Sequence, residues 1–405
     1  MPEEIKPWQD LESTARSIFE NFGFREIRTP ILERTELFSR GIGQDTDIVS
    51  KEMYTLLDSK GRGMTMRPEA TASVVRAYIQ KSLYQLDSVQ KLYSLGPMFR
   101  HERPQKGRFR QFYQLNAELI GDEGPRSDAD LIIMAMHLVS TTGLDDLTLH
   151  LNSLGCSECR PRFKEKLRDY LDERIDSLCG DCQRRAKTNP LRVFDCKVDA
   201  CKQVVANAPS ILDYLCESCQ DHFAELRGYL KKAEIPYVLN HKLVRGLDYY
   251  NRTAFEIQTE HLGAQNAVGG GGRYDGLVKL LGGPDQPAIG FALGADRIVS
   301  LLEVKGEQET PGPDLFIAAL GDKAWASCFQ QAIELRKTGL SVEMEYAVKG
   351  LKAQMKRADR LRSKKVLIVG EDELEKGAGI LRDMTTKDQQ EISLDNITEN
   401  LMKQL

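Results

Sequence analysis

The chain has 405 residues, of which 41% are hydrophobic and 29% charged, and its formal net charge is −4. This length predicts two or three domains, and the near-neutral charge means that any contact with nucleic acid must use a local basic patch. No apolar run approaches the ~20 residues that span a bilayer, and the acidic start is unlike a targeting peptide, so we expect a cytoplasmic protein without a membrane partner.

The N-terminal part is predicted to alternate between helices and strands. Apolar residues recur at helical spacing over 8–22. Residues 24–33 alternate like a strand, and Pro30 would then lie at an edge or an interface. The next expected elements are a strand at 92–95, a helix at 127–142 and strands at 147–151 and 254–257.

Residues 156–235 differ in composition from their surroundings and predict an inserted, helical domain. They hold eight of the nine cysteines. In a cytosolic protein such clustering indicates a metal rather than disulfides. The spacing resembles that of zinc ribbons, so one or two structural Zn²⁺ sites with four thiolates each are expected. The alternative is that these cysteines are small buried residues. Spacing alone leaves open which pairs combine: Cys156 and Cys159, Cys179 and Cys182, Cys196 and Cys201, Cys216 and Cys219.

The C-terminal part predicts a separate α/β domain over 314–405. A polar stretch with two prolines, 305–313, indicates a linker before it. Strands and helices then alternate, with strands at 315–317, 341–346 and 366–369 and helices at 323–337 and 350–363. The segment 349–365 holds eight basic residues and one acid, Asp359. It is either a solvated helix or a surface that binds phosphate.

The first motif with chemical meaning covers residues 96–118. It predicts two strands around a polar loop, with five cations between Arg100 and Arg110. Arginines on a rigid hairpin suit bidentate binding of phosphate. Strict alternation places one aromatic ring, two amides and a carboxylate on one face of the second strand: Phe112, Gln114, Asn116 and Glu118. This mixture is unusual for a core, although a solvated hairpin would also explain it.

Three further motifs lie in the second half of the chain. Residues 245–253 place Tyr249 and Tyr250 between charged residues, which also fits the start of a half-buried strand. Residues 267–276 contain four consecutive glycines, which either let the backbone approach a ligand closely or form a flexible turn. Residues 290–298 predict a strand, a glycine turn and a helix with Arg297 in its first turn. There is no GxxxxGK[ST] loop for phosphate.

Together these segments resemble the signature motifs of class II aminoacyl-tRNA synthetases, and specifically those of histidyl-tRNA synthetases. The likeness is carried by Thr29-Pro30 with Glu33 (first class motif), Phe99-Arg100-His101-Glu102 with Phe112 (second), Gly294 with Arg297 (third), the histidine-specific signatures at 245–250 and 271–274, and Arg67–Thr71. An Arg-Gly strand that family members usually have before the first helix is absent. An incomplete dimer interface, an incomplete floor of the site or a misassigned start would account for this departure.

The resemblance implies an α+β catalytic domain built on an antiparallel sheet over 1–155 and 236–304, the helical insertion over 156–235, and a C-terminal anticodon-binding domain. It implies ATP-dependent activation of L-histidine to histidyl-adenylate and transfer of histidine to the 3′ end of tRNA(His). The enzyme would be a homodimer with Pro30 and the helix that precedes it at the interface, and Mg²⁺ would lie beside the β- and γ-phosphates. The family does not require zinc, so a zinc site would be remote from catalysis.

Two alternatives share this fold without the reaction. One is a non-catalytic, histidine-sensing regulatory paralogue, which commonly lacks the C-terminal domain and the ATP-binding arginines. Arg100, Arg245, Arg297 and residues 314–405 are all present here, which disfavours it. The other is a pseudo-synthetase that senses uncharged tRNA and does not activate histidine.

The resemblance also implies the site residues. Histidine would contact Glu69, Ala70, Thr71, Gln114, Glu118, Arg245, Tyr249, Tyr250 and Tyr274. ATP would contact Arg100, Glu102, Arg108, Phe112 and Arg297. The tRNA would contact Arg103, Gln105, Lys106, Lys356 and Arg360. In catalysis, Arg100 would hold the α-phosphate and Arg297 the γ-phosphate, and Phe112 would stack on adenine. Arg245 would lie between the carboxylate and the α-phosphate, where other enzymes use a metal ion.

Overall fold

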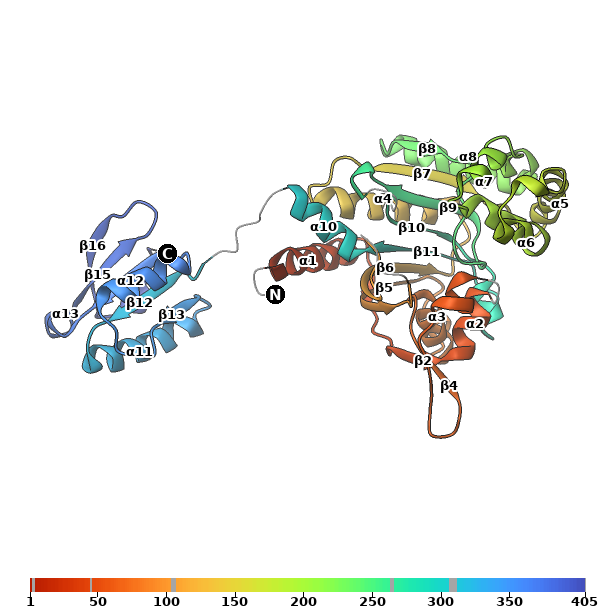
Figure 1. Cartoon of the computed structure of the whole chain (residues 1–405). Helices are drawn as coiled ribbons and strands as arrows, with labels where there is room; N and C mark the ends of the chain where they lie inside the picture. Colours follow the sequence, from red (N-terminus) through yellow and green to blue (C-terminus); the bar gives the residue numbers. More distant parts are fainter. Residues whose placement is uncertain (2–3, 44–45, 103–106, 263–265, 306–311, 405) are drawn as a thin grey trace. The chain divides into compact units, whose positions relative to one another are not determined.

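The computed structural model describes residues 1, 4–43, 46–102, 107–262, 266–305 and 312–404. Two compact units divide the chain at residue 308, Met1–Gln308 and Glu309–Leu405 (Figure 1). The predicted linker at 305–313 falls mostly outside the described residues. Across the residues that are described, no helix combines the length and the apolarity needed to cross a membrane.

An eight-stranded sheet forms the centre of the first unit. Its strands, from one edge to the other, are β1 (Arg25–Glu26), β5 (Gln90–Phe99), β6 (Gln111–Ile120), β11 (Ala288–Gly294), β10 (Ala267–Arg273), β9 (Asn251–Gln258), β7 (Thr148–Ser153) and β8 (Tyr237–Leu239). The edge pairs β1–β5 and β7–β8 are parallel, and the five pairs between them are antiparallel. The predicted antiparallel sheet is confirmed, and so is the hairpin of the first motif, β5–β6.

The prediction of one continuous strand over 24–33 is wrong. β1 pairs with β5 in the large sheet, whereas β2 (Leu32–Arg34) pairs with β4 (Gly63–Met66) in a separate sheet that also contains β3 (Thr55–Leu57). Pro30 lies between the two segments and has no backbone N–H to donate to a neighbouring strand. The chain therefore changes sheets at this proline.

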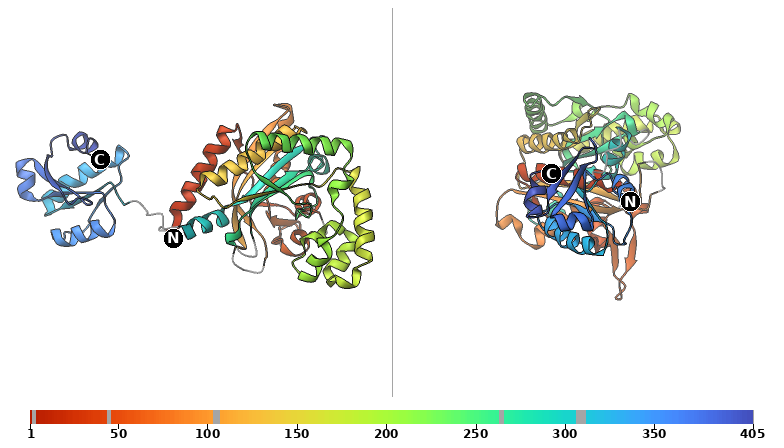
Figure 2. Two further views of the ribbon diagram at one scale, coloured as in Figure 1. Left: turned by 90° about the horizontal axis from the view of Figure 1, so that it is seen from above. Right: turned by 90° about the vertical axis from the view of Figure 1, so that its left-hand side faces the viewer.

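Four helices cover one face of the large sheet: α1 (Ile5–Asn21), α4 (Pro125–Thr141), α8 (Glu217–Lys232) and α10 (Ala295–Lys305). Seen from above, α1, α4 and α8 run along one side of the strands (Figure 2). In β6, Leu115, Ala117 and Leu119 are buried against these helices. Because successive side chains of a strand point to opposite faces, Gln114 and Glu118 lie on the other face, as predicted.

The opposite face of the sheet carries shorter elements. They are α2 (Thr35–Ile42), the π-helical turn η2 (Ile48–Glu52), α3 (Thr71–Gln80) and α9 (Leu277–Leu280), with the 3-10 turns η3 (Leu83–Gln85) and η7 (Glu260–Leu262) elsewhere in the unit. Tyr78, Tyr250 and Tyr274 pack here with Ala254 and Ala288 from the strands. This layer is thinner than the four-helix layer and leaves part of the sheet open to a cavity.

The four consecutive glycines lie inside strand β10, in the middle of the sheet, so the flexible-turn alternative is wrong. A Cβ at Gly270 would come within 2.5 Å of the Phe255 carbonyl oxygen and 2.8 Å of Arg245 Nη1. Any larger residue would displace that guanidinium. The glycine therefore lets Arg245 lie directly on the strand.

A buried network of charges joins the helices to the sheet. Arg273 in β10 is fully buried, with its Nε 2.7 Å from Asp128 Oδ1 and its Nη1 2.9 Å from Asp275 Oδ1. His222 of α8 lies 2.8 Å from the second oxygen of Asp128, which also accepts a hydrogen bond from Thr253. Arg273 belongs to a signature segment, but its contacts show that it supports the fold, since a buried charge must be paired.

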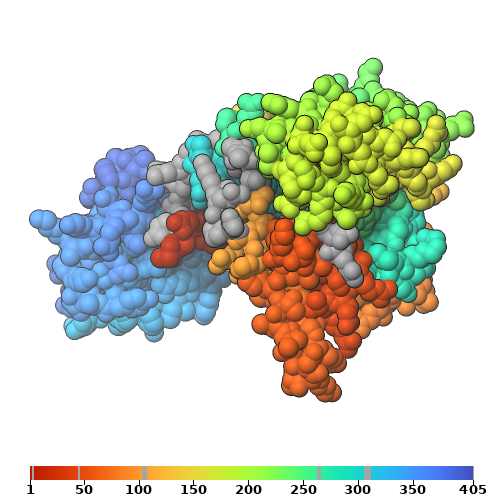
Figure 3. Space-filling view, turned by 45° about the vertical axis from the view of Figure 1, so that its right-hand side comes forward, coloured from red at the N-terminus to blue at the C-terminus, as the bar shows by residue number. Residues whose placement is uncertain are grey.

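The insertion is helical, as predicted, and leaves the sheet after β7. Its elements are α5 (Cys159–Asp172), η4 (Ile175–Ser177), α6 (Gly180–Thr188), η5 (Pro190–Asp195), α7 (Asp199–Ala206) and η6 (Ile211–Tyr214), before α8 leads back to the sheet. Phe163, Leu167 and Leu171 form a core of its own together with the cysteines. The insertion lies against the N-terminal segment, where Arg185 is 3.0 Å from Asp47 (Figure 3).

The second unit is an α/β domain with a five-stranded sheet. Its order is β13 (Val342–Met344), β12 (Leu315–Ala319), β14 (Lys365–Val369), β15 (Ala378–Asp383) and β16 (Gln389–Ser393), with the first three parallel and the last two antiparallel. One face packs on α11 (Asp322–Lys337), α13 (Glu371–Lys376) and α14 (Ile397–Met402), and the other on α12 (Leu351–Arg360). The predicted strands and helices are present, and the elements from α13 onward are additional.

Candidate functional site

A cavity of about 350 Å³ opens on the exposed face of the large sheet. Residues from all four motifs line it: Arg100, Glu102, Arg108, Phe112, Gln114, Arg245, Glu256, Gly269, Gly270, Asp296 and Arg297, together with Asp195 from the insertion. Four of these side chains are arginines. A cavity with this many fixed cations suits an anionic ligand with several phosphates.

The arginines of the hairpin and of the third class motif are held by backbone carbonyls. Arg100 Nε donates to the Pro68 carbonyl oxygen at 2.9 Å, and its guanidinium lies 5.1 Å from the centre of the Phe112 ring. Arg297 donates to the carbonyl oxygens of Gly107 and Ala267. Burial, and then the charge of nearby Arg108, lower the pKa of Arg297. Without a ligand, the positive charge of Arg297 is therefore only partly balanced by negative charge, and a bound anion would balance it further.

Arg245 connects the cavity to a buried cluster of aromatic and acidic side chains. Its Nη1 lies 2.8 Å from Glu256 Oε2, and its guanidinium lies 5.7 Å from the centre of the Tyr250 ring. Among the described residues, neither Arg245 Nε nor Gln114 Oε1 has a hydrogen-bond partner. A buried polar atom left unpaired costs about 1–3 kcal/mol. Two such atoms at one cavity indicate a ligand that completes them.

Glu118 is the acidic centre of the buried cluster. Its Oε1 accepts a hydrogen bond from Thr71 Oγ1 at 2.6 Å, and its Oε2 accepts one from the hydroxyl of Tyr274. Burial raises the pKa of Glu118 to about 8, and the two hydrogen bonds offset only part of that rise. Whether protonated or ionised, the carboxyl group keeps free lone pairs, so Glu118 can still accept a further N–H from a ligand.

Three tyrosines surround this carboxylate. The ring centres of Tyr249 and Tyr250 are 4.7 Å apart, and those of Tyr249 and Tyr274 are 5.5 Å apart. Burial raises the pKa of all three phenols, which therefore remain neutral hydrogen-bonding groups. Tyr249 and Tyr250 lie just before strand β9 and not in it, since β9 begins at Asn251.

Glu69 and Ala70 lie at the beginning of α3. Glu69 is buried, and its two carboxylate oxygens accept hydrogen bonds from the backbone N–H groups of Thr71 and Ala72 at 2.7 and 2.8 Å. These contacts satisfy two backbone donors of the first helical turn. Burial raises the pKa of Glu69, and the same two hydrogen bonds oppose the rise. Glu69 thus anchors Thr71 beside Glu118.

The predicted ATP and tRNA residues divide into three groups. Glu102 and Arg108 form an ion pair of 3.1 Å at the cavity. Arg103, Gln105 and Lys106 lie outside the described residues. In the second unit, Lys356 and Arg360 are exposed on α12 and stand one helical turn apart.

Part of the site comes from the insertion and was not predicted from any sequence motif. Asp195, the last residue of η5, lines the cavity, and burial raises its pKa to about 6 against the opposing charge of Arg192. Arg192 Nη2 donates to the Gly246 carbonyl oxygen at 2.7 Å and lies 3.2 Å from Asp248 Oδ1. The expectation that a zinc site would be remote from catalysis stays a prediction, but Asp195, which lines the cavity, directly precedes Cys196. Nothing in the spacing of the insertion signals this contact.

Comparisons with known proteins agree with this geometry. Residues 1–298 match the family model described as histidyl-tRNA synthetase, and residues 314–404 match the anticodon binding domain. Histidine–tRNA ligase of Desulfatibacillum aliphaticivorans is 57% identical over 99% of this chain and 96% of its own, and that of Desulfosudis oleivorans is 55% identical over 98% and 94%. The crystal structure of apo histidyl-tRNA synthetase of S. aureus is 36% identical, with a TM-score of 0.84, over 99% of this chain and 96% of its own.

Proposed function

This chain belongs to the histidyl-tRNA synthetase family and catalyses the ATP-dependent attachment of histidine to tRNA(His), and on that premise we propose where its substrates bind and which residues activate histidine. ATP occupies the cavity of about 350 Å³. The main support for placing ATP here is that four arginine side chains line this one cavity. Arg100 and Arg297 hold phosphate oxygens, and adenine stacks on Phe112 in place of the Arg100 guanidinium.

Histidine binds where Arg245 connects the cavity to the buried tyrosines. Glu118 accepts an imidazole N–H, and Tyr250 or Tyr274 faces the other side of the ring. Gln114, whose Oε1 lacks a partner among the described residues, accepts from the α-ammonium group. An apolar amino acid would leave these buried groups unpaired, which explains specificity for histidine.

Activation forms a bond between a histidine carboxylate oxygen and the α-phosphorus of ATP, and pyrophosphate leaves. Two anions approach each other, so negative charge on the α-phosphate oxygens must be offset as the bond forms. Arg245 can supply this positive charge because its guanidinium pairs with Glu256, and because Gly270 has no side chain that would displace it. No proton transfer is needed, because the attacking group is already a carboxylate.

The family uses ATP with Mg²⁺. The cavity fits this ion, because the carboxylates of Glu102 and Glu256 line it and Mg²⁺ in such sites takes one or two carboxylates besides phosphate oxygens and water. Glu102 and Glu256 would hold the ion. When bound, it neutralises charge on the β- and γ-phosphates.

Histidine-dependent exchange of pyrophosphate into ATP tests the assignment of both sites. We expect exchange with histidine and none without it, and saturating histidine should protect residues 244–250 from hydrogen exchange. A chain that binds tRNA(His) but shows no exchange would be a tRNA-sensing pseudo-synthetase and would contradict the proposal.

We expect the C-terminal unit, 314–405, to bind the anticodon region through α12. Lys349 and Arg357 both form ion pairs with Glu345. Lys356 and Arg360, in contrast, make no ion pair with any described residue. The variant with both residues changed to alanine should bind tRNA(His) more weakly, and the dependence of log K on log salt should fall by about 1–2, the value for two lost phosphate contacts. Filter binding at several salt concentrations measures this.

The matched control for α12 is Lys337→Ala on α11, an exposed lysine of the same unit that pairs with Glu334. It should leave the salt dependence unchanged, and neither variant should alter pyrophosphate exchange. An unchanged salt dependence in the α12 variant would mean that this helix face does not contact tRNA.

We also expect a homodimer joined through the small sheet that follows Pro30. Ile31, Leu32, Leu56 and Leu57 are 41%, 44%, 56% and 75% exposed, and the β3–β4 hairpin protrudes from the unit (Figure 3). Exposed apolar side chains on one small sheet are typical of an interface. Light scattering should give twice the chain mass of 45.7 kDa.

The variant Leu57→Glu should shift this dimer toward monomer, because it places a charge in the apolar contact. Leu86→Glu is the control, since Leu86 is 74% exposed on a different part of the unit. A wild-type mass of one chain at micromolar concentration would refute the dimer.

A further inference from the structure

The eight cysteines of the insertion form two groups of four, and each group surrounds one point. Cluster I consists of Cys156, Cys159, Cys216 and Cys219, and cluster II of Cys179, Cys182, Cys196 and Cys201. We propose that each cluster binds one zinc ion, and that the ion in cluster II holds part of the insertion against the histidine-activating site. The second half of this proposal rests on the proposed function, whereas the first half does not.

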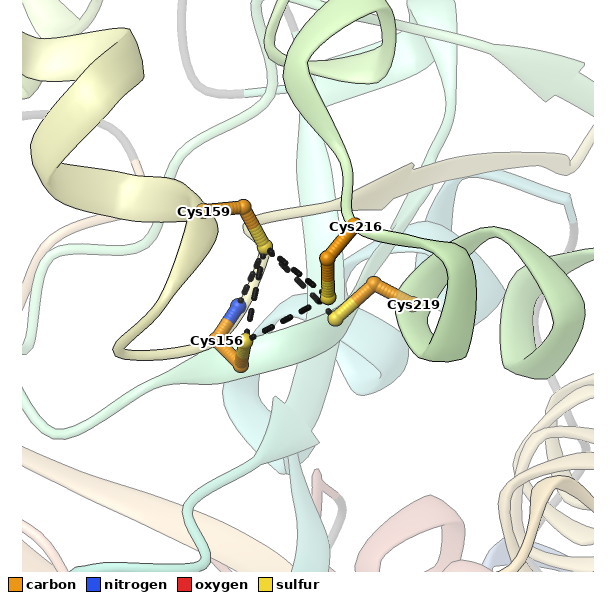
Figure 4. A group of neighbouring side chains, drawn as sticks. All are labelled: Cys156, Cys159, Cys216 and Cys219. Carbon is orange, nitrogen blue, oxygen red and sulfur yellow. Dashed lines mark hydrogen bonds between the residues drawn. The ribbon is translucent and has the colours of Figure 1, made fainter.

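The sulfur positions of cluster I match a tetrahedral metal site. The distances from Cys156 Sγ to Cys159 Sγ and Cys216 Sγ are 3.5 and 3.8 Å, and those from Cys159 Sγ to Cys216 Sγ and Cys219 Sγ are 3.8 and 3.7 Å (Figure 4). A tetrahedron with Zn–S bonds of about 2.3 Å has edges of about 3.8 Å. Disulfide sulfurs lie about 2.05 Å apart, so none of these four pairs is a disulfide.

Cluster II has the same geometry in a different part of the insertion. Its four sulfurs lie within 4.8 Å of one another, and Cys179 Sγ is 3.8 Å from Cys196 Sγ. The first cysteine pair along the chain therefore combines with the fourth, and the second pair combines with the third. The spacing in the sequence had left this pairing open. In an iron–sulfur cluster the four cysteine sulfurs are divided among two or four iron atoms and do not all surround one ion, so single-ion sites fit better.

The backbone around the sulfurs stabilises negative charge. The N–H groups of Cys156 and Cys179 point to Cys159 Sγ and Cys201 Sγ, each at 3.2 Å. Cys179 and Cys216 precede the first turns of α6 and α8, where the partial positive charge of a helix N-terminus favours a thiolate. Thiolates are the form that Zn²⁺ binds. Four neutral thiols packed for their size alone would not need this environment.

The backbone also makes room for the sulfurs of cluster I. Gly155 has φ +64°, and a Cβ there would lie 3.0 Å from Cys159 Sγ. A glycine thus provides the turn from β7 into the first cysteine pair. The ninth cysteine, Cys328, gives the contrast. It is buried in the core of the second unit, whose sequence holds no other cysteine, and burial raises its pKa to about 12.

Cluster I closes the base of the insertion. It joins the beginning of α5 to the beginning of α8, 57 residues apart from Cys159 to Cys216. Arg160, the next residue of α5, donates to the carbonyl oxygens of Leu154 and Tyr250. The metal would thereby fix the direction in which the insertion leaves the sheet, and closing a long loop removes entropy from the unfolded chain.

Cluster II holds the segment that reaches the active site. Cys196 directly follows η5, and η5 carries Arg192 and Asp195. Arg192 contacts Gly246 and Asp248, and Asp195 lines the cavity beside Arg245. Zinc in cluster II would therefore keep these two side chains in place, while cluster I would act on the insertion as a whole.

Metal analysis of the full chain, purified without chelators, tests both ions. We expect two zinc equivalents per chain, one in Cys156→Ser/Cys159→Ser, one in Cys179→Ser/Cys182→Ser, and two in the control Cys328→Ala. Less than half an equivalent of zinc with all nine thiols freely titratable would overturn the proposal, and so would iron in place of zinc.

Hydrogen exchange with mass spectrometry tests the role of cluster II apart from activity. Loss of that ion should speed exchange at residues 190–195 and 244–250 at least tenfold, whereas loss of the cluster I ion should act first on 154–160 and 216–219. If a serine variant does not fold, stepwise release of zinc from the wild type with a mercurial gives the same comparison. Unchanged exchange at 244–250 after cluster II is emptied would overturn the link to the active site. Wild-type pyrophosphate exchange, measured separately, shows whether the proposed function itself fails.

Discussion

Replacing Arg245 with alanine should lower histidine-dependent ATP–pyrophosphate exchange by about 10²-fold or more and leave the fold intact. The side chain lines the cavity proposed for ATP, lies 2.8 Å from Glu256, and has an Nε without a partner among the described residues. It therefore supplies a fixed charge where the α-phosphate and the histidine carboxylate meet. Removal of one such donor typically costs 10²–10³ in rate. The exchange rate at saturating ATP and histidine measures the loss.

The variant Arg245→Lys separates charge from shape. Lysine keeps the positive charge but cannot bind two oxygens through a planar fork, so its rate should lie between those of the wild type and the alanine variant. Arg28→Ala is the control, because Arg28 is 79% exposed, pairs with Glu26 two positions before it, and does not line the cavity. Near-normal exchange in a folded Arg245→Ala protein would remove this residue from the mechanism.

Glu118→Gln should raise the KM for histidine roughly 10- to 150-fold and leave the KM for ATP nearly unchanged. A hydrogen bond from an imidazole N–H to a carboxylate contributes about 1.5–3 kcal/mol, which corresponds to this range. In the proposed assignment ATP is held by the arginines of the cavity, which Glu118 does not contact in the structure. Equal changes in both KM values would show that Glu118 supports the fold rather than histidine.

The same variant should change how stability depends on pH. The pKa of Glu118 is about 8 in the folded chain and 4.5 as the ordinary value. Between these values the folded protein keeps a proton that the unfolded chain has lost, so the free energy of unfolding falls as pH rises and levels off above pH 8. The shift corresponds to at most about 5 kcal/mol. Glutamine cannot ionise, so the Glu118→Gln variant should not lose this part of its free energy of unfolding as pH rises.

Urea unfolding between pH 5 and pH 9, without histidine, measures the effect. The wild type should lose stability relative to Glu118→Gln as pH rises through this window, and the difference isolates Glu118 from other titrating groups. Parallel curves for the two proteins would mean that the buried carboxylate has an ordinary pKa and is already ionised at neutral pH.

Much of this protein could be predicted from its sequence because the signals were local. Alternation along residues 112–118 placed Gln114 and Glu118 on one face of a strand, and the structure agrees, because side-chain direction in a strand depends only on position. The turn from Gly294 into the helix that carries Arg297 was equally local. The family resemblance rested on the same short segments, each of which keeps its residues together wherever the chain folds.

Other features depended on residues far apart in the sequence. The glycines of β10 looked like a possible turn, and only the neighbouring strands and Arg245 show why a side chain is excluded at Gly270. Arg273 belonged to a signature segment, yet its partner Asp128 comes from α4, 145 positions away, and makes it a structural residue.

The sequence by itself determined the fold class, the motifs and the presence of cysteine pairs, because periodicity, glycine turns and short spacings act over a few residues. Only the tertiary structure decided that the first cysteine pair meets the fourth, and that Asp195 of the insertion reaches the cavity of the candidate site. The physical reason is that each contact depends on how separate helices pack, and packing is set by the shape and burial of whole surfaces rather than by neighbours along the chain.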